Sequence, residues 1–209
     1  MVQTIAVTEA ITDLNEAHRR FDLRRANRDF FPEWQTDLPE LSEHEKAALA
    51  HYGDRYLDYA AEGFISEGTV NVILVSPLLE LLGLCDSPYR IRGERYVEIA
   101  IENEDTVLRG RIDALIVQNQ LWINLIEAKH FGFSVLQAVP QTLAYMMAYP
   151  PTQPVVYGLV TTGEDYIFLK LNRAKRQYAL SYKFTLLADE NNNLHRVVRI
   201  LKQIKQRMA

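Results

Sequence analysis

The chain has 209 residues, of which 48% are hydrophobic and 24% are charged, a balance typical of a globular protein and not of a disordered segment. Its single cysteine, Cys85, excludes an intramolecular disulfide and a cysteine-rich zinc cluster, and it fits a reducing compartment. A net charge of −4 argues against a strongly basic coat for nucleic acid but leaves room for a local basic groove. With neither a secretory signal nor an apolar run long enough to span a bilayer, we expect a soluble cytoplasmic protein.

The first 61 residues predict a helical N-terminal extension. Residues 9–28 have a helical composition and carry a basic cluster, which is either an arm that contacts phosphates or a solvated helix face. The cluster consists of His18, Arg19, Arg20, Arg24, Arg25 and Arg28. Further along, Ser42 and Glu45 form a Ser-x-x-Glu capping box, and Gly63 is placed to end the helix that begins there.

A second helical stretch runs from Ser66 to Gly83, with Glu67 in its first turn. Apolar residues recur along one face of this stretch at helical spacing: Val70, Ile73, Leu74, Leu78 and Leu81. Because Pro77 cannot donate a backbone hydrogen bond, we expect a kink or an interruption near Ser76.

From Arg90 onward the apolar pattern changes to the alternation typical of strands. It predicts one strand up to residue 101, a second at 107–117 and a third at 121–129, the last two joined as an antiparallel hairpin by residues 118–120. The remaining elements are a helix at 134–149 or one that begins at Pro140, strands at 155–161 and 166–171, an edge strand within 177–187, and an amphipathic helix capped by residues 191–193. This order indicates a single domain of the α/β or α+β class, with a mixed sheet flanked by helices at 62–187 and a C-terminal helix at 188–209.

Charged residues occur at the end of the third predicted strand, which is otherwise apolar. Glu127 and Lys129 are two residues apart and therefore point to the same face. Placing both at the end of a buried strand costs desolvation energy unless they are paired or bind an ion. Asp113, on the second strand, shares this face if the hairpin loop has three residues or a bulge intervenes, whereas a two-residue loop turns Glu127 away. We predict the arrangement that brings the three side chains together.

Two carboxylates that converge beside a lysine suit Mg²⁺, which prefers a few carboxylate oxygens and keeps several waters. Such an ion can activate water and orient a phosphate, while a lysine can hold the attacking water or neutralise charge on the phosphate. The pattern therefore predicts phosphodiester hydrolysis that depends on Mg²⁺ or Mn²⁺. The structural alternative is a buried Asp–Lys–Glu ion-pair cluster.

These residues belong to a longer series of motifs at 78–84 (LLELLGL), 110–115 (GRIDAL), 126–129 (IEAK) and 141–145 (QTLAY). In this order the motifs resemble the PD-(D/E)XK nuclease superfamily. More narrowly, the stretch from about residue 62 to 171 resembles the N-terminal nuclease domain of type I restriction enzyme R subunits, in the small stand-alone form found in cyanobacteria. The resemblance implies a restriction-endonuclease-like core and a metal-dependent deoxyribonuclease. The chain departs from the family in having Ile112 where the superfamily's name expects proline, and in lacking a P-loop and a helicase region.

By position, the resemblance implies that Asp113 and Glu127 ligate the metal and that Lys129 serves the nucleophile or the transition state. Gln141 and Tyr145 match the family's Q-x-x-x-Y and would lie on one helix face, where they could steady the site or contact DNA. A glutamate on an early helix often completes the family's site. The candidates are Glu67, then Glu80, with Glu98 on the first strand as a further one.

Arg111 and Lys170 are additional candidates for contact with DNA. Two basic runs either line a DNA groove or form solvated edges. These runs are Arg90, Arg92 and Arg95, and Lys170, Arg173, Lys175 and Arg176. DNA is the expected partner, without ATP or a membrane, and a homodimer is one way to cut both strands. The alternatives from another class are a DNA-binding or assembly subunit that keeps the nuclease fold without turnover, and a purely structural oligomer.

Overall fold

The computed structural model describes residues 3–93, 95–100, 106–112, 114–118, 120–125, 134–148, 154–186 and 193–208. Its helices are α1 (Val7–Ala10), α2 (Leu14–Phe21), α3 (Glu43–Glu62), α4 (Glu67–Val70), α5 (Ser76–Leu81), α6 (Val139–Ala148) and α7 (Asn193–Met208). Its strands are β1 (Gln3–Ala6), β2 (Arg24–Arg25), β3 (Ile91–Arg92), β4 (Arg95–Ala100), β5 (Thr106–Ile112), β6 (Ala114–Val117), β7 (Leu121–Leu125), β8 (Val155–Thr161), β9 (Asp165–Asn172), β10 (Gln177–Leu180) and β11 (Phe184–Thr185). Short 3-10 turns lie at Arg28–Phe30, Pro32–Trp34 and Val135–Ala138, and a π-helical turn lies at Asn71–Val75.

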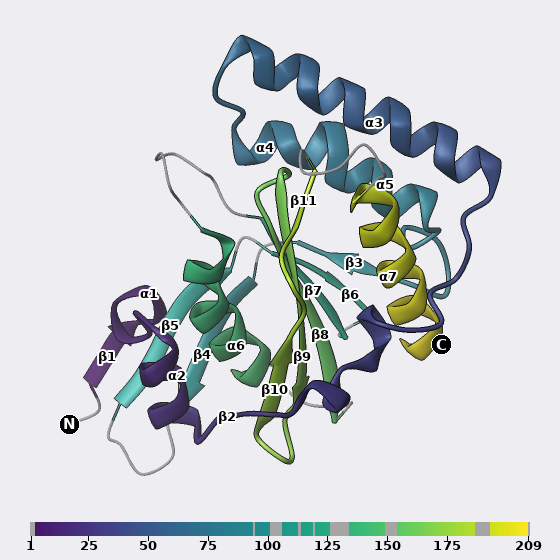
Figure 1. Cartoon of the computed structure of the whole chain (residues 1–209). Coiled ribbons are helices and arrows are strands. Elements are labelled where there is room, and N and C mark those ends of the chain that lie inside the picture. The colour runs from purple at the N-terminus through teal and green to yellow at the C-terminus, as the bar shows by residue number, and fades with distance from the viewer. Residues whose placement is uncertain are drawn as a thin grey trace.

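The strands described here form two sheets (Figure 1). The larger has eight strands in the order β2-β10-β9-β8-β7-β6-β3, with β11 beside β9, and the smaller has three in the order β1-β5-β4. In the larger sheet β7 is parallel to β8, whereas β6–β7 and β8–β9 are antiparallel. The expected mixed sheet is therefore confirmed.

Helices cover both faces of the larger sheet, as the alternation along β7 requires. Leu121, Ile123 and Leu125 pack in one core with side chains from α3, α5 and α7. Trp122 packs in the other core with side chains from α1, α2 and α6. Because successive residues of a strand point to opposite faces, this division makes three layers, with the sheet in the middle.

The helix signals in the sequence are confirmed. The hydroxyl oxygen of Ser42 accepts a hydrogen bond from the Glu45 N–H at 3.2 Å, and the Glu45 carboxylate accepts one from the Ser42 N–H at 2.7 Å, so the capping box opens α3. The helix ends before Gly63, which has a φ of 130°. The π-helical turn directly precedes α5, the helix that contains Pro77. A wider turn leaves room for the proline ring and accounts for the expected interruption near Ser76.

One expectation was wrong, because residues 107–117 do not form one strand. The structure divides them between β5 in the smaller sheet and β6 in the larger. The neighbouring strand is divided as well: Arg92 pairs with Ile116, but Arg95 pairs with Ile112. Residues 93–94 therefore lie against residues 113–115, and a difference of one residue is typical of a β-bulge, which bends and twists a strand. The bend lets one pair of strands serve two sheets.

The N-terminal extension is also not simply helical. It contributes β1, which runs parallel to β5, and β2, which runs parallel to β10. The predicted long helix is divided because Asp13 caps α2 through two backbone N–H groups, and because Asp22 adopts a left-handed conformation that ends this helix. Within the basic cluster, Arg19 and Arg20 both bind Glu16, and His18 binds the Tyr178 hydroxyl. These contacts favour the solvated helix face.

The C-terminal half follows the expected order. Helix α6 begins at Val139 with Pro140 as its second residue, the position where a proline is tolerated. The predicted edge strand is present as β10, although β2 lies beyond it, and as the separate short strand β11. The apolar stripe of α7 is buried: Leu194, Val197, Val198, Leu201, Ile204 and Met208. Within the described ranges, no helix combines the length and apolar character needed to cross a membrane.

Candidate active site

The three charged residues at the centre of the predicted site, Asp113, Glu127 and Lys129, lie outside the described residues. The strands that carry them are described up to Ala114 and Leu125. Ala114 pairs with Asn124 and Val117 pairs with Leu121, so residues 118–120 form the connection. The predicted three-residue loop is confirmed, and the two-residue hairpin that contradicts the site is not found here.

The end of β7 lies beside the end of β8, where Leu125 pairs with Thr161. The following turn is held by two hydrogen bonds: the Gly163 N–H donates to Thr161 Oγ1 at 2.9 Å, and the Tyr166 hydroxyl donates to the Gly163 carbonyl at 2.6 Å. Complete burial raises the pKa of Tyr166 above its usual value, so this hydroxyl keeps its proton. The turn therefore fixes the end of the sheet that Glu127 follows in the sequence.

Helix α4, which carries Glu67, packs against this turn. A Cβ added at Gly163 would lie 2.7 Å from Val70 Cγ1, one helical turn after Glu67. Figure 1 shows α4 over the upper end of the larger sheet. Glu67 is half-buried in the first turn, behind the N-cap Ser66. Of the other two candidates, Glu80 is exposed on α5, and the Glu98 side chain lies outside the description.

Helix α6 carries Gln141 and Tyr145 on the opposite face of the sheet. Tyr145 is 6% exposed. A Cβ added at Gly110 would lie 2.8 Å from its hydroxyl oxygen, so glycine at this position lets the ring approach β5 closely. The buried ring positions α6 three residues before Asp113, and burial leaves Tyr145 unsuited to contact DNA. Gln141 is half-buried one turn earlier in α6.

A polar contact that the sequence reading missed joins α6 to β7. The Asn124 amide donates to the hydroxyl of Thr142 at 2.9 Å, and this hydroxyl donates to the Ala138 carbonyl at 2.8 Å. Thr142 is the residue after Gln141. The signal was present in the sequence, because Asn124 is the one polar residue of the strand Leu-Trp-Ile-Asn-Leu.

Lys170 lies away from this end of the sheet. It pairs with Tyr157 across β8–β9, and Tyr157 pairs with Leu121, so Lys170 lies beside the start of β7, roughly 13 Å along the strand from Leu125. Its ammonium group is 2.6 Å from a Glu33 carboxylate oxygen, and the Lys170 side chain is 12% exposed. Pairing and burial leave Lys170 unsuited to bind a phosphate.

The remaining basic candidates differ in exposure. Arg111 pairs with Tyr96 in the smaller sheet, and its side chain lies outside the description. Arg173 is half-buried and donates to the Met147 carbonyl. Arg90 and Arg92 are exposed at strand β3, which pairs with β6. These two arginines are the described cations of the basic runs that lie nearest to β6.

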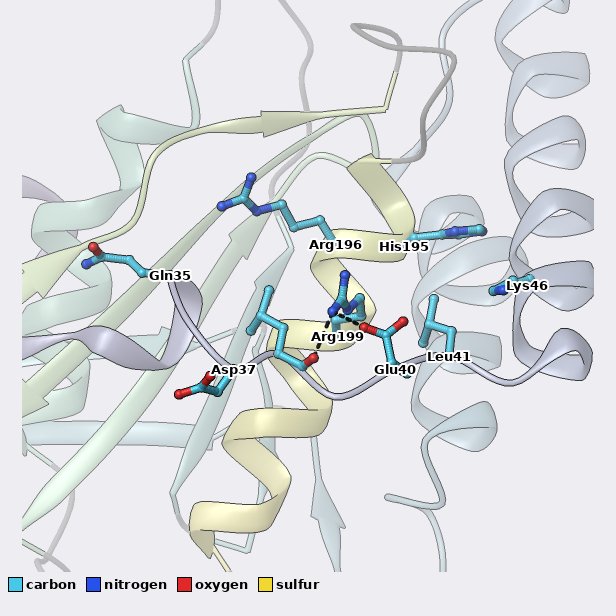
Figure 2. Close-up of a pocket in the computed structure, with 9 residues that line it drawn as sticks. Gln35, Asp37, Glu40, Leu41, Lys46, His195, Arg196 and Arg199 are labelled. Carbon is cyan, nitrogen blue, oxygen red and sulfur yellow. Dashed lines mark hydrogen bonds and ion pairs between the residues drawn. The ribbon is translucent and has the colours of Figure 1, made fainter.

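A separate pocket of about 450 Å³ lies between α7, the segment before α3, and the first turn of α3 (Figure 2). Arg199 builds it by donating to the Leu38 and Pro39 carbonyls and to the Glu40 carboxylate. The pocket contains none of the predicted site residues. On its other side, His195 points toward Lys46 (Figure 2), and its Nε2 is buried without a hydrogen-bond partner among the residues described. Burial and the Lys46 charge lower the pKa of His195.

The lowered pKa predicts that the protein loses stability in mild acid. Below pH 6.5, the usual pKa of histidine, the unfolded chain binds a proton that folded His195 does not, so the free energy of unfolding falls with pH until the lower folded pKa is passed. In urea unfolding between about pH 5 and 7, His195→Gln should therefore show a flatter pH dependence than wild type. His44→Gln, at an exposed histidine, should keep the wild-type slope. Equal slopes for wild type and His195→Gln would contradict the burial of this ring.

The chemistry of the site rests on residues beyond the described ranges. In the part of the chain that the structure describes, no group of three or more histidine, cysteine, aspartate or glutamate side chains could hold a metal ion. Asp113 and Glu127 are not within that part. Compared with models of protein families and with curated proteins, the chain matches none of them.

Proposed function

We propose that the chain is a metal-dependent deoxyribonuclease with a restriction-endonuclease-like core. The observation that carries the proposal is the register of β6 and β7, in which Ala114 faces Asn124 across a three-residue connection. A residue one place before Ala114 and a residue two places after Leu125 share a face if this register continues. These positions are Asp113 and Glu127. The half-buried Glu67 at the same end of the sheet supports it as the third carboxylate, ahead of the exposed Glu80.

The donor set fits a hard divalent cation. Two carboxylates, with a third available from α4, offer the oxygen ligands that Mg²⁺ and Mn²⁺ prefer. When bound, the ion would supply positive charge at the scissile phosphate. Lys129 would hold the attacking water or neutralise charge that develops on the phosphate oxygens. Gln141, half-buried on α6, would steady the site.

A DNA-binding surface must be local, because the net charge is −4. The exposed arginines of β3, Arg90 and Arg92, lie beside β6 and are suited to phosphate contacts near the proposed site. Lys170 is not part of this surface, because Glu33 neutralises its charge. We infer that binding weakens with salt in proportion to a small number of phosphate contacts.

The proposal is tested by incubating the purified chain with supercoiled plasmid and with linear DNA, in Mg²⁺, in Mn²⁺ or in EDTA. We expect cleavage in either metal and none in EDTA. Plasmid nicking separates endonuclease from exonuclease activity, because an exonuclease leaves a closed circle intact. Binding without cleavage in both metals would contradict the nuclease and favour the DNA-binding or assembly subunit.

A further inference from the structure

Three stretches of the proposed site meet at Asn124. Across β6–β7 it pairs with Ala114, the residue after Asp113. In the chain it precedes Glu127 by three residues. Its side chain donates to Thr142, the residue after Gln141. A single side chain therefore connects the segments that contain the proposed metal ligands with the helix that contains Gln141.

The Asn124–Thr142 contact is well ordered by its surroundings. Thr142 is 2% exposed, and its hydroxyl both accepts from Asn124 and donates to the Ala138 carbonyl one turn earlier. Both bonds fix the direction of the hydroxyl proton, since a hydroxyl has a single proton to donate. The contact thus defines where the first turn of α6 lies on β7.

Stability alone does not explain an asparagine at this position. Asparagine is depleted in strands, and the neighbours of Asn124 in β7 are buried apolar residues. An aliphatic side chain facing α6 would avoid burying an amide. The amide is therefore best explained by what it aligns, because hydrogen bonds fix geometry more tightly than apolar contacts do.

We propose that Asn124 and Thr142 are positioning residues of the nuclease site, which hold α6 on β7 so that Gln141 stays aligned with the proposed metal ligands. The inference rests on the proposed function. Neither residue touches the reacting atoms in this scheme. Misplacing a site by about 1 Å can cost about 100-fold in rate, so loss of the link should act on turnover and leave substrate binding largely intact.

The test compares Thr142→Val, which removes the hydroxyl but keeps the shape, with Thr142→Ser, which keeps the hydroxyl. Steady-state cleavage of a linear DNA should show kcat reduced about 10- to 100-fold in Thr142→Val, with KM within about twofold of wild type. Thr142→Ser should cleave at close to the wild-type rate. Hydrogen exchange of the α6 amides in metal-free protein should be faster in Thr142→Val and unchanged in Thr142→Ser.

A purely structural role is separated from positioning by a second buried variant. Ile200→Val, in α7 on the other face of the sheet, removes one methyl group from the core. It should lower the denaturant midpoint as Thr142→Val does, yet cleave at the wild-type rate. If Thr142→Val also cleaves at the wild-type rate, the positioning role is overturned while the nuclease stands. If wild type cleaves in neither metal, the proposed function fails and this inference fails with it.

Discussion

Lys129→Ala is expected to reduce Mg²⁺-dependent DNA cleavage by about 100- to 1,000-fold or more, and Asp113→Ala to abolish it. Removing one preorganised group that stabilises charge in the transition state typically costs this factor. Loss of Asp113 removes a metal ligand as well. The measurement is single-turnover cleavage of linear DNA in Mg²⁺, with enzyme in excess.

The same variants distinguish catalysis from a structural ion-pair cluster. If the three charges were a buried ion-pair cluster, removing Lys129 would leave two carboxylates uncompensated and cost about 3–5 kcal/mol of stability. If they form a metal site, removing one charge in metal-free protein relieves repulsion or leaves stability nearly unchanged. Urea unfolding in EDTA therefore decides between the two, independently of any cleavage assay.

Lys183→Ala is the matched control for Lys129→Ala, because it removes the same charge elsewhere. The Lys183 side chain is 49% exposed and pairs only with Asp165, at 2.9 Å, so its loss should change neither cleavage nor stability measurably. Asp58→Ala, at an exposed position of α3, plays the same part for Asp113→Ala. Wild-type cleavage by both site variants would contradict the proposed mechanism.

Local chemistry made the helices predictable. Ser42 and Glu45 specify the start of α3 through side chains that bind backbone groups within the same turn. Pro77 requires an interruption wherever the rest of the chain lies. The apolar strip of α7 could likewise be read without knowledge of its partners, because any core would bury it.

Features that depend on distant partners could not be read in this way. The division of residues 106–117 between two sheets follows from the register of another strand pair, which the alternation within one strand does not encode. Strand β1 depends on pairing with β5, about a hundred residues later. Lys170 appeared as one member of a basic run, and nothing near it in the sequence shows that Glu33, 137 residues away, neutralises it.

The candidate site divides along the same line. The three-residue hairpin connection was predictable, because turn length and strand pattern are local. The contacts of α6 were not, since Gly110 and Tyr145 come together only in the fold. Asn124 is intermediate: its polarity marks it in an apolar strand, but only the structure identifies Thr142 as its partner.

Gly163→Ala should lower the free energy of unfolding by about 2–4 kcal/mol, which combines overpacking with a left-handed backbone conformation. The φ of Gly163 is +90°, and an added Cβ would lie 2.7 Å from Val70 Cγ1 and 2.8 Å from Tyr56 Cε2. Both neighbours belong to helices packed on the end of the sheet, so the methyl group must displace α4 or strain the turn. Guanidinium unfolding followed by tryptophan fluorescence measures the loss.

Gly53→Ala provides the opposite control, because nothing lies within 4 Å of a Cβ added at this position in α3. It should raise stability by about 0.5–1 kcal/mol, since alanine is the better helix former. The pair also tests Glu67. If Glu67 on α4 completes the metal site, folded Gly163→Ala at low temperature should need more Mg²⁺ for half-maximal cleavage, as Glu67→Gln should, whereas Gly53→Ala should not. Wild-type stability in Gly163→Ala would contradict the packing of α4 against the turn, and a wild-type metal requirement in Glu67→Gln would exclude Glu67 from the site.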